Sequence, residues 1–247
     1  MLKSYKVKTI ELGVQTSNDY ILKRCKRNHT FEDAKKASKL IRRYGFILGH
    51  QMMIGLPEST RLDDLNTAKE LTKLKPKMMR IYPVLVIKGT ELEQEYKNGT
   101  YKPLVLEQAV ERCKELYYYF IRKNIKVIRM GLQTTDLITN PDKEGSEVVA
   151  GPYHPAFGQL VEDAVWYDSI VNKIKKFNVK VKEVEISVNP KNVNNIIGHK
   201  KENLLKLKEI YDVDVTLIQD KKKEEGRFDI KILKTYTDFL EENELVK

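Results

Sequence analysis

The sequence predicts an α/β protein with a parallel sheet, followed by a smaller α+β unit. Short apolar runs of strand length alternate with amphipathic helical segments over residues 8–132, a pattern typical of βα units. Near residue 180 the composition changes, and a strand, two short helices and two further strands are predicted. A chain of 247 residues is long enough to bury a core in each part.

The elements of the first part are set by caps and stop signals. Thr30 and Asp33 have the spacing of a capping box, while Gly45 and Pro76 end helices. We expect strands at residues 8–14, 46–54, 78–87 and 125–132, and helices at 18–26, 30–44, 60–75 and 106–124. Right-handed crossovers place all the strand carboxyl ends at one rim, where α/β barrels carry their ligand-binding groups.

About four βα units are too few to close a barrel. The first strand begins at residue 8, and the preceding Met1–Lys6 reads as the end of a helix that packs beside that strand. We therefore expect the downstream part of a larger, TIM-like barrel. The alternative is a complete open sheet, which would leave an exposed edge strand.

Composition limits which cellular compartment and which kinds of partner we expect. Residues 1–179 hold 31 Lys and Arg against 21 Asp and Glu, whereas residues 180–247 hold 14 of each, so the formal charge of +10 lies in the first part. Such a surplus favours a polyanionic partner, although solvated helix faces would give the same count. Cys25 and Cys113 are expected as free thiols in a reducing compartment. With no secretory signal and no apolar run of the ~20 residues that a membrane span needs, we expect a cytoplasmic protein.

Two segments carry the most information about function, Glu11–Gln15 and Gln51–Pro57. Each reads as a buried strand that ends in a glycine-containing turn, and a basic helix with Arg27 and His29 joins them. Taken alone, a strand-end glutamine more often satisfies nearby backbone, and Arg27 fits a solvated helix-end cation. His29 fits local capping as well as proton transfer.

In order and spacing, a series of segments resembles the radical S-adenosylmethionine (SAM) proteins. The resemblance is greatest to the group related to the catalytic subunit of Elongator, and oxygen-independent coproporphyrinogen oxidases are similar at a greater distance. The segments are Glu11–Thr16, Lys26–Thr30, Ala34, Gly45–Phe46, Met52–Pro57, Arg80–Pro83, Gly89–Leu92, Tyr101–Pro103 and Gly151–Phe157.

The resemblance implies SAM and a [4Fe–4S] cluster as cofactors, and a set of SAM-binding residues. Gln15 would hydrogen-bond the ribose, and Arg27 would pair with the methionyl carboxylate. Gln51 would also contact the ribose, and Glu11 would contact SAM or buttress its site. The whole set is Glu11, Gln15, Arg27, Gln51, Ile54, Gly55 and Leu56, with the last three along the adenine and Gly55 allowing close backbone approach.

The sequence departs from the family pattern in its cysteines. It has no Cys-x-x-x-Cys-x-x-Cys motif, and Cys25 and Cys113 cannot replace three thiolates. We therefore expect no metal ligands in this chain and no reductive SAM cleavage by it alone. An N-terminal half outside this sequence would carry the cluster cysteines.

Candidate substrate contacts lie at or near the same rim. They are His29, Tyr82 and His154. His154 lies between prolines and aromatic residues in Gly151–Phe157, a constrained loop that suits either substrate binding or a packed lid.

The last part resembles a KH-type RNA-binding module. Residues 180–247 predict the order strand, helix, turn, helix, strand, strand, with a turn of Gly198, His199, Lys200 and Lys201. KH modules clamp nucleic-acid backbone with a Gly-x-x-Gly loop, and here Lys201 replaces the second glycine. A purely structural appendage is the alternative. We divide the chain into residues 1–132, 133–179 with a linker helix at 156–177, and 180–247.

Three functions follow from these interpretations. The first is a radical SAM enzyme, present as a fragment without cluster cysteines, that acts on tRNA or another RNA. The second is a non-catalytic RNA-binding protein descended from such an enzyme. The third is a radical enzyme of the coproporphyrinogen-oxidase type with a small-molecule substrate.

Overall fold

The computed structural model describes residues 2–238 and divides the chain into two compact units. The first is Met1–Gly158 and the second is Gln159–Lys247. No helix within residues 2–238 is long and apolar enough to cross a membrane. Each unit is described by itself below.

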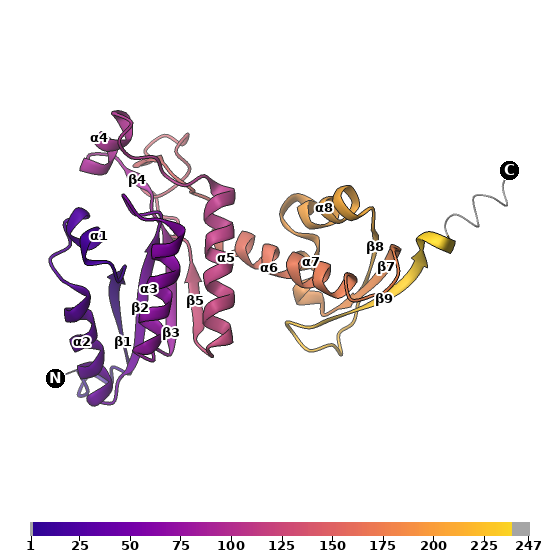
Figure 1. Ribbon diagram of the computed structural model, residues 1–247, viewed down its shortest axis with the longest axis horizontal. Coiled ribbons are helices and arrows are strands. Elements are labelled where there is room, and N and C mark those ends of the chain that lie inside the picture. The colour runs from indigo at the N-terminus through magenta and orange to yellow at the C-terminus, as the bar shows by residue number, and fades with distance from the viewer. Residues whose placement is uncertain (1, 239–247) are drawn as a thin grey trace. The chain divides into compact units, whose positions relative to one another are not determined.

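The first unit alternates strands and helices along most of its length (Figure 1). Its elements are β1 (Thr9–Gln15), α1 (Asp19–Arg24), α2 (Phe31–Arg43), β2 (Ile47–Ile54), α3 (Arg61–Lys73), β3 (Met78–Pro83), β4 (Val86–Ile87), α4 (Glu91–Lys97), α5 (Leu106–Arg122), β5 (Lys126–Met130) and β6 (Val148–Ala150).

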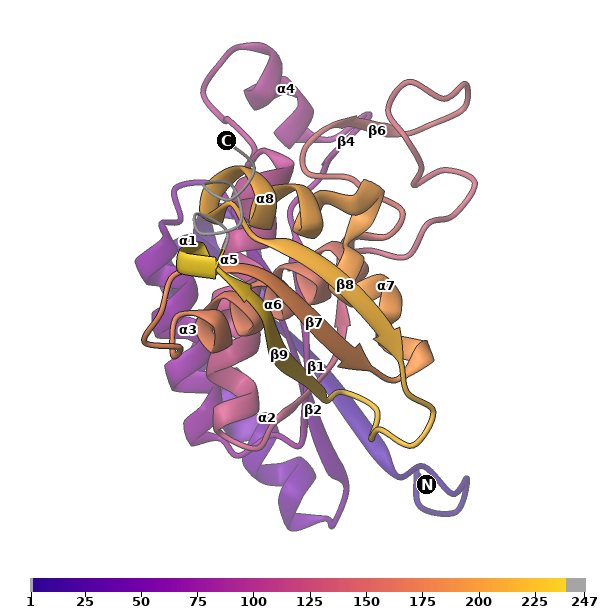
Figure 2. The same ribbon diagram turned by 90° about the vertical axis from the view of Figure 1, so that its right-hand side faces the viewer.

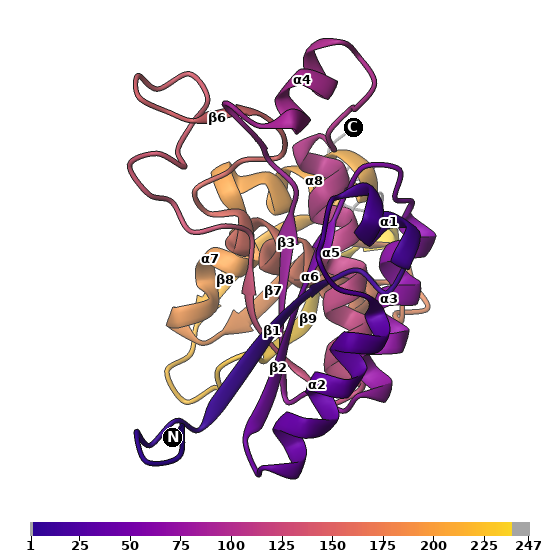
Figure 3. The same cartoon turned by 90° about the vertical axis from the view of Figure 1, so that its left-hand side faces the viewer.

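Strands β1, β2, β3 and β5 form one sheet in that order, and each adjacent pair is parallel. Helices α2, α3 and α5 cover one face of this sheet (Figures 1 and 3). The predicted parallel α/β architecture is therefore confirmed. Figure 1 shows the carboxyl ends of the strands on the side where α1 and α4 lie.

The helix-covered face of the sheet is apolar. Along β2 and β3, alternate side chains pack under the helices with no more than 2% of their surface exposed: Leu48, Met52, Ile54, Met79 and Ile81. Full burial of such a side chain contributes about 1.5–3 kcal/mol. This face therefore fixes where each strand ends, and with it the position of every group at the rim.

The structure differs from the sequence prediction after β3. The expected strand of residues 78–87 is interrupted at Val84 and Leu85, and β4 pairs antiparallel with β6 in a separate two-stranded sheet. Pro83 ends β3 because proline has no N–H to donate to a continued ladder. Helix α4 follows, capped by the Thr90 side chain, where the sequence indicated only a turn.

The second unit packs helices on one face of a three-stranded sheet (Figure 2). Strand β7 is central, parallel to β8 and antiparallel to β9. The elements are α6 (Phe157–Ile174, which begins at the end of the first unit), β7 (Val181–Val188), η1 (Pro190–Asn192), α7 (Val193–Ile197), η2 (His199–Lys201), α8 (Glu202–Tyr211), β8 (Asp214–Gln219) and β9 (Phe228–Thr235).

Helix α6, the helix expected as a linker, contributes to the core of the second unit. Ile170 packs in one apolar cluster with Val184 and Ile186 of β7 and with Leu207 of α8. The observed order of strands and helices is the one that the sequence predicts. Identity with a KH-type module stays a prediction, because element order alone does not define that fold.

Candidate functional site

Gln15, the last residue of β1, has an unusual backbone conformation at the rim. Its φ is +69°, although it is not a glycine, and only 7% of its surface is exposed. The left-handed region costs about 1–2 kcal/mol for a residue with a Cβ. Strain of this kind persists where the surroundings impose it and often marks a functional position.

Neighbouring residues hold the Gln15 amide in place. Gln51 of β2 donates from its Nε2 to the Oε1 of Gln15 at 3.0 Å. Gly13 leaves space for this arrangement, since a Cβ there would lie 2.8 Å from the Nε2 of Gln15. The two strand-end glutamines therefore form one polar unit.

Arg27 reaches the same point from the loop after α1. Its Nη2 lies 3.5 Å from the carbonyl oxygen of Gly13, and its side chain borders the cavity that Gln15 also borders. The structure thus brings the glutamine amide and the guanidinium to the border of one cavity.

That cavity has a volume of about 300 Å³, within the range of small-molecule sites. It lies at the carboxyl ends of β1 and β2, with the polar groups of Gln15 and Arg27 at its border. Most of the remaining wall is apolar: Ile21, Leu22, Met53, Leu56, Pro57, Val84, Leu85 and Leu92. A polar end and an apolar wall suit an amphipathic ligand such as a nucleoside.

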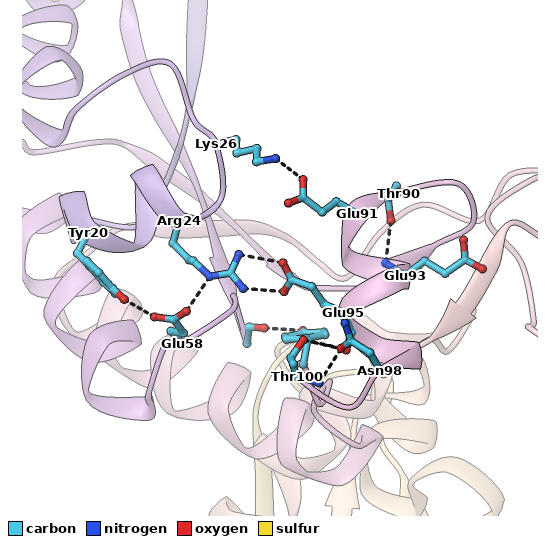
Figure 4. A network of polar contacts seen from close by, with 12 residues as sticks. Tyr20, Arg24, Lys26, Glu58, Thr90, Glu91, Glu93, Glu95, Asn98 and Thr100 are labelled. Carbon is cyan, nitrogen blue, oxygen red and sulfur yellow. Dashed lines mark hydrogen bonds and ion pairs between the residues drawn. The ribbon is translucent and has the colours of Figure 1, made fainter.

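A network of ion pairs joins α1 and α4 across the cavity (Figure 4). Arg24 of α1 makes a bidentate contact with Glu95 of α4, at 2.9 and 2.7 Å. The Nε of Arg24 lies 2.7 Å from Glu58 in the loop after β2, and Lys26 pairs with Glu91. These contacts fix the wall that α4 contributes, and sequence patterns alone do not show them.

Two of the three predicted adenine contacts, Ile54 and Gly55, do not border this cavity. Ile54 is fully buried on the helix-covered face and does not border the cavity. Gly55, with φ +75°, makes room for Leu104, and its carbonyl accepts a hydrogen bond from the Tyr101 hydroxyl at 2.7 Å. Leu56 does border the cavity.

His29 borders a second cavity of about 240 Å³. The cavity lies between β1 and α2, and Arg27 borders it as well. The Nε2 atom of His29 is buried and has no hydrogen-bond partner within residues 2–238.

On the sheet face opposite α2, α3 and α5, Glu11 forms an ion pair with Arg80 of β3. The Oε2 of Glu11 lies 2.6 Å from the Nε of Arg80, and Oε1 accepts from Nη2 at 3.1 Å. The Nη1 of Arg80 donates to the Tyr82 hydroxyl at 3.1 Å. Glu11 therefore buttresses an arginine that sequence reasoning missed, because the register that joins β1 to β3 through β2 is not visible in the sequence.

His154 packs at the ends of β3 and β5. It lies with Tyr153 and Phe157 against Gly131, and its Nδ1 accepts a hydrogen bond from the Ala156 N–H at 3.1 Å. The Tyr153 hydroxyl is 3.1 Å from the Thr134 hydroxyl. The loop is thus held in place beside the rim.

In the second unit, the turn of residues 198–201 has positive φ at Gly198, Lys200 and Lys201. Asp163 of α6, only 5% exposed, accepts the His199 N–H at 3.0 Å. Asn203 donates to backbone oxygens of residues 163 and 195, at 3.0 Å each. Buried polar groups therefore impose the conformation of this turn.

Comparison with known proteins assigns the family. Residues 1–71 match the model of the radical SAM superfamily, and residues 76–166 match the radical SAM C-terminal domain. The chain belongs to the radical SAM superfamily. The resemblance seen in the sequence is therefore confirmed.

Relatives of this radical SAM chain include proteins of the Elongator group. The tRNA uridine(34) acetyltransferase of Methanocaldococcus jannaschii is 45% identical over 105 residues, which is 41% of this chain and 19% of that protein. Human Elongator complex protein 3 is 29% identical over 111 residues, or 44% and 20%. The chain thus matches about a fifth of the length of these relatives.

A solved structure is also similar to this chain. The archaeal Methanocaldococcus infernus Elp3 with an N-terminal deletion superposes with a TM-score of 0.57 and 31% identity. The superposition covers 70% of this chain and 38% of that one.

Radical SAM proteins use SAM and a [4Fe–4S] cluster, and the two groups fit this chain differently. The cavity at Gln15 and Arg27 offers amide and guanidinium donors beside an apolar wall, which suits SAM. A cluster needs several thiolates. Residues 2–238 contain no group of three or more His, Cys, Asp or Glu side chains that could hold a metal, and the sequence has only Cys25 and Cys113.

Proposed function

We propose that the first unit binds SAM at Gln15 and Arg27 and forms part of a radical SAM enzyme that acts on tRNA. The observation that supports this most directly is the Gln15 amide. It is buried, has a strained backbone, and lies beside a guanidinium at the border of a 300 Å³ cavity. A merely structural strand end has no need of that arrangement.

Each residue has a defined part in this proposal. Gln15 and Gln51 bind the ribose hydroxyls, and Arg27 binds the methionyl carboxylate through a charged hydrogen bond. Leu56 and Met53 offer apolar surface to the adenine. SAM held there would be the cofactor for radical chemistry, which also needs a [4Fe–4S] cluster. Since this chain lacks cluster ligands, we propose that cysteines outside its sequence provide them.

The proposed substrate rests on the relatives and on charge. The relatives named above include tRNA uridine(34) acetyltransferases, and the excess of Lys and Arg lies in residues 1–179. A positive surface attracts nucleic acid at long range. We do not extend the proposal to acetyl transfer, because the similarity covers so little of those proteins. No separate observation favours a small-molecule substrate of the coproporphyrinogen-oxidase type.

Calorimetric titration of SAM into the full chain tests the cofactor site. Arg27→Ala should weaken binding by about 1.5–3 kcal/mol, the usual value of a charged hydrogen bond. Arg43→Ala, an exposed arginine in the last turn of α2, is the control and should bind SAM as the wild type does. Equal affinity of wild type and Arg27→Ala would remove Arg27 from the site, and absence of SAM binding to the wild type would refute the proposal.

The turn of residues 198–201 supports RNA binding as a second candidate function. It presents His199, Lys200 and Lys201 on a backbone that Asp163 holds from beneath. Lysines held in this way can bind phosphates of an RNA backbone. Substitution of Gly198 is a poor test, because a Cβ there would lie 2.8 Å from the Asn203 side chain.

A charge-matched pair of double variants gives a cleaner test. Lys200→Gln with Lys201→Gln should weaken binding of a single-stranded RNA, and Lys221→Gln with Lys222→Gln in the β8–β9 connection should not. Equal loss from both pairs would mean that general charge, not this turn, binds RNA. Intact RNA binding together with no SAM binding would favour a non-catalytic RNA-binding protein.

A further inference from the structure

The first sheet has a polar face opposite α2, α3 and α5, called the open face below. Register pairs Gly13 with Gln51 and Gln51 with Arg80, and after a bulge-like register shift between Met79 and Arg80 it pairs Arg80 with Arg129 of β5. Paired residues of neighbouring parallel strands point to the same face. One row across the open face therefore reads Gly, Gln, Arg, Arg, where closed α/β barrels pack branched apolar side chains.

Such a row cannot be a packing surface. Burying an arginine against apolar groups costs several kcal/mol unless it is fully paired. The side chain of Arg80 remains 31% exposed and Arg129 is exposed. The open face is therefore suited to a polar ligand.

The two arginines of this row differ in how their positive charges are neutralised. Glu11 neutralises Arg80, and the Arg80 Nη1 also donates to the Tyr82 hydroxyl, so this guanidinium is held in one place. The Nη1 of Arg129 donates to the neutral Gln133 amide oxygen at 2.9 Å, and no carboxylate within residues 2–238 pairs with Arg129. The face thus combines a fixed guanidinium with a neighbouring one that retains its full charge.

Adjacent strands are about 4.8 Å apart, so two such side chains can reach one anion. Guanidinium groups bind phosphate oxygens in a bidentate manner and keep their charge at every physiological pH. The conclusion below rests on the proposed function, in which an RNA nucleotide enters at the rim near Gln15.

We propose that Arg129, with Arg80 beside it, binds a phosphodiester next to the nucleotide that reacts. Arg129 supplies the charge, and Arg80, held by Glu11, supplies a fixed donor. The pair then sets the depth to which the nucleotide enters, and it selects an RNA chain over a neutral nucleoside.

The test combines one protein substitution with one RNA substitution. A labelled anticodon stem–loop with a uridine at the first anticodon position binds the full chain, and fluorescence anisotropy gives its affinity. A second stem–loop carries neutral methylphosphonates in place of the phosphates on both sides of that uridine. The wild type should bind the second RNA about tenfold more weakly, the usual loss of one charged hydrogen-bonded contact.

Arg129→Gln should bind the unmodified RNA about tenfold more weakly than the wild type does, and it should not distinguish the two RNAs. Arg43→Gln, with the same charge change on α2, should distinguish them as the wild type does. Retained discrimination by Arg129→Gln, or none by the wild type, would overturn the inference.

A SAM titration of the same proteins separates this inference from the proposed function. Arg129→Gln should bind SAM with wild-type affinity, because Arg129 does not border the SAM cavity. If the wild type binds no SAM but the RNA pattern is as described, the proposed cofactor fails and the phosphate site stands. If SAM binds normally and the RNA pattern is absent, the phosphate site alone fails.

Discussion

The two faces of the first sheet differ although they are built from the same strands. On β2, Leu48, Met52 and Ile54 lie under the helices with at most 2% exposure. Between them, Gly49 and Gln51 belong to the open face, where Gln51 holds the amide of Gln15. Neighbouring residues of one strand thus belong to a packed core and to a polar face.

Residues that stabilise the fold therefore alternate along each strand with residues that a ligand can reach. Helix-side residues contribute through apolar burial, and residues of the open face contribute through groups that ligands can reach. The separation also explains why the site has a fixed geometry. Each polar group of the open face is attached to a strand whose other side is packed.

The largest expected effect tests this separation on adjacent residues of β3. Ile81→Ala should lower the free energy of unfolding by about 2–5 kcal/mol, because Ile81 is fully buried and a cavity would remain. Arg80→Ala should lower it by less than about 1 kcal/mol, since its ion pair with Glu11 is partly exposed. Urea denaturation measures both. Similar losses from the two variants would show that the open face is also a stabilising surface.

The second prediction concerns His50, the polar residue of the helix-covered face. Burial lowers its pKa to about 4, and its Nε2 lies 2.8 Å from the Ser38 hydroxyl. In the unfolded chain its pKa is near 6.5, so the unfolded state binds a proton first as the pH falls. From pH 7 to pH 4, His50 should therefore remove about 2–3 kcal/mol of stability.

The matched variant for this measurement is His50→Met. It should lose that part of the pH dependence, and Ser38 keeps its hydrogen bond to the Ala34 carbonyl. Burial raises the pKa of Asp64, which pairs with Arg112, to about 7, so Asp64 gives stability the opposite dependence on pH. Asp64 is present in both proteins, and its contribution cancels when their profiles are subtracted. Parallel pH profiles of wild type and His50→Met would show that His50 is protonated as easily when folded.

Periodicity and capping residues predicted most of the fold. The box of Thr30 and Asp33 is observed, and the parallel sheet follows from the alternation of strands and helices. The break after Pro83 was missed because Val84 to Ile87 are as apolar as the strand before them. Helix α4 was missed because its short charged sequence has no apolar period.

Candidate site residues within the family motifs could be named from the sequence, and their partners could not. Gln15 and Arg27 were named through family resemblance. Arg80 and Arg24 depend on strand register and on how α1 and α4 pack, which no local pattern encodes. The same limit explains Ile54, which stands in the motif but points to the helix-covered face.

The last prediction concerns Gln15, which has a strained backbone and is the proposed SAM contact. Gln15→Gly relieves the positive φ but loses the amide and its hydrogen bond with Gln51. The strain of about 1–2 kcal/mol offsets the usual cost of glycine and of a lost hydrogen bond, so stability should stay within about 1 kcal/mol of wild type. Gln15→Ala loses the same amide and keeps the strain, so it should be less stable than Gln15→Gly, the reverse of the usual order.

Both variants should bind SAM about tenfold more weakly. Urea denaturation and SAM titration check the two halves separately: an alanine variant as stable as the glycine one would show that the backbone is unstrained, and retained SAM affinity would mean that the amide does not contact the cofactor.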